Sequence, residues 1–137
     1  MNLYRYDLHV HTAETSPCGN VGSTELVRLY KKAGYTGVVI TDHYFSDFFE
    51  ALGDIRWEKK IDIFLKGYRK ALSEGEKLGL KVLLGMEMRF DENWNDYLVF
   101  GIDEDFLEQH EYLSKLGLKK FKALIEDKNI LIYQAHP

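Results

Sequence analysis

The sequence contains a single cysteine, Cys18, so no disulfide can form within the chain. One unpaired cysteine fits a reducing compartment. The first ten residues are too polar for a secretory signal. No apolar run approaches the roughly 20 residues that a membrane-spanning helix needs. These absences predict a cytoplasmic protein that has no membrane partner.

The sequence also lacks an excess of basic residues. Its 18 Lys and Arg are outnumbered by 22 Asp and Glu, which gives a formal net charge of −4. Proteins that bind nucleic acids usually present a basic face, so the charge balance argues against a nucleic-acid partner. The length of 137 residues fits one domain, and a hydrophobic content of 45% is enough for a buried core.

Strand and helix patterns alternate along most of the chain. Apolar and β-branched runs predict strands at residues 3–10, 37–41, 81–88, 96–102 and 130–134. Helical spacing predicts helices at residues 23–33, 57–78, 104–116 and 118–127, and a short helix within 44–56. This order, with one direct strand-to-strand step near residue 90, predicts an α/β fold with five mainly parallel strands.

Four of the five histidines lie at or just beyond the end of a predicted strand. They are His9, His11, His43 and His136, and Glu87 lies near the end of the third strand. The carboxyl ends of parallel strands share one edge of the sheet, where ligands bind. We therefore expect these five residues to converge on one rim.

The segment His9-Val10-His11 is the sharpest local feature of the sequence. Side chains two apart on a strand point the same way, so the two Cβ atoms would lie roughly 6–7 Å apart. Two imidazoles placed in this way can share one metal ion. The alternative interpretation is a pair of histidines that are hydrogen-bonded at a strand end.

Each of the other candidates also has an alternative interpretation. Asp42 could bind metal or orient an imidazole, and Asp42-His43 could equally be a turn with a surface histidine. Glu87 is a carboxylate inside an apolar strand and needs a partner, which could be one or two bridged cations. Arg89 or Arg5 could serve instead. His136 could be a residue of a terminal loop.

Three further polar residues are harder to place. Asp96 opens the fourth predicted strand and is a ligand candidate, although a parallel strand would put it at the wrong end. His110 is expected on a helix and in solvent. Cys18 could line the site, but a small buried thiol is the commoner role for a single cysteine.

Four motifs occur in order along the chain: Asp7-Leu8-His9-Val10-His11-Thr12, Thr41-Asp42-His43, Gly85-Met86-Glu87 and Ala135-His136-Pro137. Together they resemble the polymerase and histidinol phosphatase (PHP) family. The resemblance implies a distorted barrel of alternating strands and helices, with a cluster of two or three metals at its carboxyl rim. Members of the family include phosphoesterases, histidinol phosphatases and polymerase-associated modules.

The resemblance also implies a set of ligands. His9, His11 and Glu87 would hold one metal, Glu87 and His136 a second, and His43 would belong to a third. Two departures from the family pattern stand out. The fourth strand offers Asp96 where a histidine is common, and the loop after the first strand has Pro17, Cys18 and Asn20 where the family has His or Asp.

The family barrel continues with further strands and a late Asp-x-His motif that residues 1–137 do not contain. We therefore expect this chain to be the N-terminal part of a single PHP-like domain with an incomplete barrel. The fifth strand would then have an open edge, through which copies of the chain could associate. We also expect the chain alone to bind metal weakly.

The resulting functional hypothesis is a metal-dependent phosphoesterase that acts on a small-molecule phosphate ester. Two cations about 3.5–4 Å apart would clamp the phosphate and activate water, so that His9, His11 and Glu87 act through the metal. Histidine-rich ligation favours Zn, Mn or Fe. Amidohydrolase-like metal chemistry and a truncated, inactive metal-binding module are the alternatives.

Overall fold

The computed structural model describes residues 2–137, and the chain divides into two compact units. Unit 1 contains the residues up to Asp42 together with Phe64–Leu84, and unit 2 contains His43–Ile63 together with Gly85–Pro137. The boundary falls within one strand, so strand β4 (Lys81–Arg89) contributes residues to both units.

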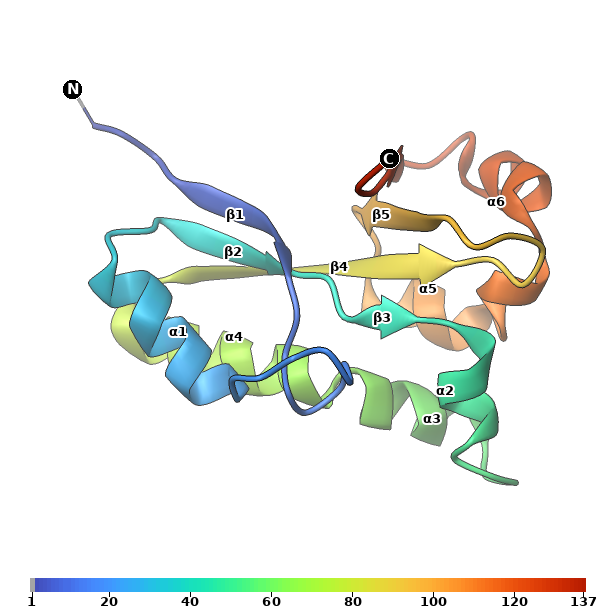
Figure 1. Ribbon diagram of the computed structural model, residues 1–137, viewed down its shortest axis with the longest axis horizontal. Coiled ribbons are helices and arrows are strands. Elements are labelled where there is room, and N and C mark those ends of the chain that lie inside the picture. The colour runs from blue at the N-terminus through green and yellow to red at the C-terminus, as the bar shows by residue number, and fades with distance from the viewer. Residues whose placement is uncertain (1) are drawn as a thin grey trace. The chain divides into compact units, whose positions relative to one another are not determined.

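Unit 1 is built on three parallel strand segments. Strand β1 (Tyr6–Val10) pairs with β2 (Gly37–Ile40), and β2 pairs with the first four residues of β4. Helices α1 (Ser23–Lys32) and α4 (Lys66–Leu78) lie next to each other on one side of these strands (Figure 1). The buried core between the two layers consists of Val10, Leu26, Val27, Val38, Ile40, Ala71, Leu80 and Val82.

Unit 2 combines strands of both orientations. The two-residue strand β3 (His43–Tyr44) runs parallel to β4, whereas β5 (Asp96–Phe100) is antiparallel both to β4 and to β6 (Leu131–Gln134). Its helical segments are α2 (Ser46–Glu50), most of α3 (Trp57–Phe64), α5 (Glu104–Gln109), a 3₁₀ turn (Leu113–Lys115) and α6 (Leu118–Ile125).

Aromatic rings dominate the core of unit 2. Phe49 packs against Tyr44 and Trp57, with ring centroids 4.7 and 4.9 Å apart. A second group joins Phe90 of the β4–β5 connection to Phe121 of α6 at 5.5 Å. Tilted ring contacts of this kind add to the stability that comes from burying the ring area.

All five strands predicted from the sequence are present, and the α/β class is confirmed. The direct step near residue 90 is the antiparallel connection from β4 to β5. The sequence did not reveal β3, because two residues are too few for a periodic pattern. Within the described chain β6 pairs only with β5, so association through its outer edge stays a prediction.

The single helix predicted for residues 57–78 is wrong. The structure has two helices that are interrupted at Leu65, whose ψ of −2° lies far from the helical value. The Thr15 hydroxyl donates a hydrogen bond of 3.1 Å to the carbonyl of Phe64. A carbonyl at a helix end that is satisfied by a side chain allows the helix to stop there.

The helix predicted for residues 104–116 is also wrong beyond its first half. Helix α5 ends at Gln109, and Tyr112 adopts a left-handed backbone with φ of 47°. His110 therefore follows the helix and is partly buried, with its Nδ1 2.8 Å from the Phe106 carbonyl. None of the helices within residues 2–137 is long and apolar enough to cross a membrane.

We expect Phe121→Ala to destabilise the fold by about 3–5 kcal/mol, because Phe121 is fully buried and the truncation leaves a cavity. Urea unfolding followed by circular dichroism would measure the loss. Leu131→Ala is the matched control, since that side chain is 55% exposed and should cost below about 1 kcal/mol. Equal losses for both variants would contradict the assignment of this core.

Candidate metal centre

The carboxyl end of β1 in unit 1 brings His9 and His11 together as the H-x-H spacing predicts. Their Nε2 atoms are 3.1 Å apart and their ring centroids are 5.0 Å apart. One ring donates this hydrogen bond and the other accepts it. Two nitrogens bound tetrahedrally to one cation at about 2.0–2.1 Å would lie about 3.3 Å apart. The pair therefore fits a shared metal with little adjustment.

Asp42 holds the loop that follows His11. Its Oδ1 accepts hydrogen bonds from the Thr12 backbone N–H and the Ser16 hydroxyl, each at 2.7 Å, and its Oδ2 accepts from the Thr12 hydroxyl at 2.7 Å. Burial raises the pKa of Asp42, and the hydrogen bonds from Thr12 and Ser16 oppose that rise. Asp42 thus anchors the loop through Thr12 and Ser16, and its expected roles as a metal ligand or as the partner of an imidazole stay predictions.

Gly67, in the first turn of α4, packs directly against this arrangement. A Cβ added there would overlap the Thr12 hydroxyl and would lie 3.1 Å from Asp42 Oδ2. The carbonyl of Gly67 accepts a hydrogen bond of 2.7 Å from the Ser23 hydroxyl. Only a residue without a side chain lets α4 approach the loop this closely.

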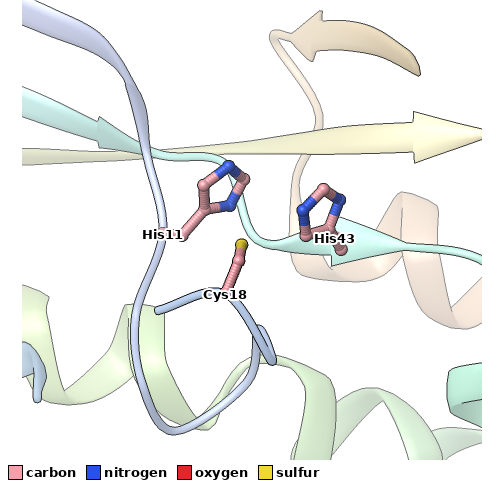
Figure 2. Close-up of side chains that lie close together, drawn as sticks. All are labelled: His11, Cys18 and His43. Atoms are coloured by element: carbon pink, nitrogen blue, oxygen red, sulfur yellow. The ribbon is translucent and has the colours of Figure 1, made fainter. Parts of the chain in front are cut away.

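Cys18 lies on the same loop, and the structure corrects the prediction of a buried thiol because the residue is exposed. Possible ligand atoms of Cys18 and His11 lie within 4.8 Å of one another. Figure 2 shows the Cys18 sulfur pointing toward the His11 ring, and it also labels His43 on β3. The loop bends back toward His11 because the Asp42 hydrogen bonds hold Thr12 and Ser16.

Unit 2 places an imidazole near each oxygen of the Glu87 carboxylate. Glu87 is 1% exposed. Its Oε1 accepts a hydrogen bond of 2.7 Å from His136 Nε2, and its Oε2 lies 3.6 Å from His43 Nδ1. A carboxylate that has one imidazole near each of its oxygens is arranged like a carboxylate that bridges two cations.

Strand pairing explains why these three residues meet. His43 lies directly opposite Glu87 in the parallel pairing of β3 with β4. His136 follows β6, where the Ala135 N–H donates a hydrogen bond of 2.8 Å to the Asp96 carbonyl. The backbone of His136 is left-handed with φ of 26°, a conformation that residues other than glycine seldom adopt.

Asp96 lies at the start of an antiparallel strand, directly opposite Arg89. Its two oxygens accept hydrogen bonds from Arg89 Nε at 2.8 Å and Nη2 at 3.0 Å. A bidentate pair of this kind is strong and geometrically specific. Arg89 therefore forms its hydrogen bonds with Asp96, and its charge also interacts with that of Glu87, the other partner considered for it.

Ser16 and Gly67 were not singled out from the sequence, and Thr12 appeared there only as the last residue of the first motif. Thr12 follows the H-x-H motif directly, and its hydroxyl and N–H both bind Asp42. Proximity to that motif is the one local signal that could have identified it. Gly67 carries no signal at all, since its role depends on a loop more than 50 residues earlier in the chain.

The fold and the clustered histidines define an α/β protein with a candidate metal site. A family model for the PHP domain matches residues 7–133, and the chain belongs to this family. The expected family and fold type are thus confirmed. No match was found among curated proteins.

Three solved structures are similar to the chain. A proposed metal-dependent phosphoesterase of Bifidobacterium adolescentis is 26% identical with a TM-score of 0.52, over 79% of this chain and 32% of that one. A two-domain protein of Bacteroides vulgatus with a predicted PHP-like metal-dependent phosphoesterase is 19% identical with a TM-score of 0.58, over 94% and 34%.

The third structure is an amidohydrolase of Chromobacterium violaceum, solved with bound sulfate and no metal. It is 19% identical with a TM-score of 0.51, over 86% of this chain and 33% of that one. The two structures at 19% identity show likeness of fold alone. The present chain spans about a third of the length of each of the three proteins.

We expect Gly67→Ala to displace the Thr12 hydroxyl from Asp42 and to destabilise the chain by about 1–3 kcal/mol through overpacking. Thermal unfolding measures the stability. Gly22→Ala is the matched control, because its new methyl group would meet only a Glu14 oxygen at 3.5 Å. If Gly67→Ala unfolded no earlier than this control, the close packing of α4 on the loop would not matter for stability.

Proposed function

We propose that this chain supplies the metal-binding part of a phosphoesterase that hydrolyses a small-molecule phosphate ester. The observation that carries the proposal is the buried Glu87 carboxylate with imidazole nitrogens of His43 and His136 at its two oxygens. Membership of the PHP family and the 26% identity to a proposed phosphoesterase support the same reaction class.

The donor atoms match the proposed metals. His9 and His11 of unit 1 would hold one cation, and Glu87 and His136 of unit 2 would hold another. His43 would belong to a third cation. Histidine-rich ligation suits Zn, Mn or Fe better than Ca or Mg. Cations held there would polarise the phosphoryl oxygens and lower the pKa of water.

Residues of the chain would prepare the site before substrate arrives. The His9–His11 hydrogen bond keeps both Nε2 atoms turned toward one point. Asp42 anchors Thr12 and Ser16, so the loop after His11 is held by the protein itself. Such preorganisation reduces the cost of collecting ligands around a cation, and residues that hold ligands affect metal affinity strongly.

The metal site can be tested without any substrate. We expect His9→Ala and Glu87→Gln each to weaken the binding of Mn²⁺ or Zn²⁺ to the metal-free chain at least about tenfold. Isothermal titration calorimetry, with metal content checked by mass spectrometry, measures the effect. His110→Ala is the matched control, because His110 bonds the Phe106 carbonyl and is outside the proposed ligand set.

Unchanged affinity in both variants, or equal losses in the His110→Ala control, would contradict the ligand assignment.

The reaction itself is a separate question. We expect the metal-loaded protein to hydrolyse phosphomonoesters, and we expect a chelator or Glu87→Gln to lower the rate at least about 100-fold. A panel of phosphoesters and amides measures this. Turnover of amides without turnover of phosphoesters would favour amidohydrolase chemistry instead.

A further inference from the structure

Strand β1 does not pair regularly with β2 along its whole length. Asp7 lies opposite Val38, but Val10 lies opposite Ile40, so three steps along β1 (7 to 10) are matched by two steps along β2 (38 to 40). One residue of β1 is therefore extra, as in a β-bulge, and the alternation of its side chains is interrupted there. His9, a proposed metal ligand, lies inside this irregular stretch.

The surroundings of the side chains on β1 reflect the extra residue. Leu8 is 52% exposed whereas Val10 is 4% exposed, although residues two apart on a regular strand face the same side. Asp7 and Val10 are three apart, yet both lie on the side that α1 covers, because Asp7 bonds Tyr30 of α1 and Val10 belongs to the core cluster. Without the extra residue, His9 would lie on the same side as Asp7 and would point into the helix layer.

Asp7 makes the hydrogen bond that holds the irregular stretch. Its Oδ1 accepts a hydrogen bond of 3.0 Å from the backbone N–H of His9. A bond from an aspartate side chain to the N–H two residues later closes a local turn and competes with regular strand pairing. The Val10 N–H donates to the Thr41 hydroxyl at 3.0 Å, and the Val10 carbonyl accepts from the Thr41 N–H at 2.7 Å. The turn therefore ends before Val10, where the contacts with the chain of β2 resume.

Tyr30 fixes the orientation of the Asp7 carboxylate from helix α1. Its hydroxyl donates a hydrogen bond of 2.7 Å to Oδ2, whereas the His9 N–H binds Oδ1. The Tyr30 ring is itself held, since it packs edge-on against Tyr35 with centroids 4.9 Å apart and contacts the buried core of unit 1. Each oxygen of Asp7 thus has a partner, and Asp7 links the helix layer to the backbone of His9.

We propose that Asp7, oriented by Tyr30, is a positioning residue that turns His9 away from the helix layer and toward His11. The short distance of 3.1 Å between the Nε2 atoms of the two histidines follows from this turn. Bulges beside functional sites re-aim side chains in this way. The inference rests on the proposed function in that His9 is taken to be a metal ligand. Asp7 acts through the backbone of His9 and not as a ligand.

The geometric part of the proposal is tested in the metal-free chain by NMR. The two readouts are the nuclear Overhauser cross-peak between the rings of His9 and His11 and the hydrogen exchange of the His9 amide. We expect Asp7→Ala to abolish the cross-peak and to remove the protection of this amide. Asp7→Asn keeps an oxygen for the His9 N–H and should preserve both. A folded Asp7→Ala chain that keeps the cross-peak would overturn the proposal.

Tyr30→Phe is the milder variant, because it keeps the ring and removes only the hydroxyl that binds Asp7. We expect faster exchange of the His9 amide and a weaker cross-peak. Tyr35→Phe is the matched control, since it removes a hydroxyl from the neighbouring ring and leaves the bond to Asp7 in place, and it should change neither readout. Thermal unfolding of each variant identifies the temperature at which all of them are folded. Equal results for the two tyrosine variants would overturn the role of Tyr30.

Metal affinity tests the consequence for the ligand. We expect Asp7→Ala to weaken Zn²⁺ binding about tenfold, and Tyr30→Phe to weaken it less, about threefold, because the bond from Asp7 to His9 remains. Isothermal titration calorimetry measures both effects. Asp7→Asn should bind Zn²⁺ like the unaltered chain. If it lost as much affinity as Asp7→Ala, Asp7 would act through its charge, as a ligand does, and the positioning role would be overturned.

The positioning role and the proposed reaction fail separately, because the NMR readouts need neither metal nor turnover. Loss of the His9–His11 cross-peak in Asp7→Ala, in a protein that hydrolyses no phosphoester, would reject the proposed reaction and support the positioning role. Phosphoesterase activity together with an unchanged cross-peak in Asp7→Ala would reject the positioning role alone.

Discussion

The buried carboxylate of Glu87 sets the requirement on which the arrangement of unit 2 depends. A charged group placed inside an apolar strand is costly unless polar partners surround it. The pairing of β3 with β4 puts His43 directly opposite Glu87, and the chain after β6 brings His136 to its other oxygen. The short β3 and the left-handed His136 thus both place an imidazole beside this carboxylate.

Asp42 is the buried carboxylate of unit 1, and it too requires polar partners, which here are not imidazoles. Its partners are hydroxyls and a backbone N–H, so its carboxylate is satisfied by the fold and holds the loop after His11. Asp42 is also bonded through one peptide bond to His43. Consecutive Cα atoms are about 3.8 Å apart. Asp42, which anchors the loop of unit 1, is therefore the direct neighbour in the chain of His43, the first proposed ligand of unit 2.

Features with a local period could be predicted from the sequence, and features created by distant contacts could not. The period of two placed His9 and His11 on one face, and apolar runs located the five longer strands. The break at Leu65 depends on Thr15, some 50 residues earlier, and the exposure of Cys18 depends on how Asp42 bends its loop. Asp96 was doubted as a rim residue because the orientation of its strand was not known, and the antiparallel pairing removes that objection.

The register of β4 with β5 decides which acidic residue, Asp96 or Glu87, forms hydrogen bonds with Arg89. Arg89 lies directly opposite Asp96 and two residues beyond Glu87, so the antiparallel pairing gives the guanidinium to Asp96. A guanidinium has only donors and cannot give way to a metal ion at a carboxylate without leaving its own charge unpaired. An imidazole can exchange its proton for a metal and become a ligand itself. Because two hydrogen bonds hold the guanidinium at Asp96, the oxygens of Glu87 have the imidazoles of His43 and His136 beside them.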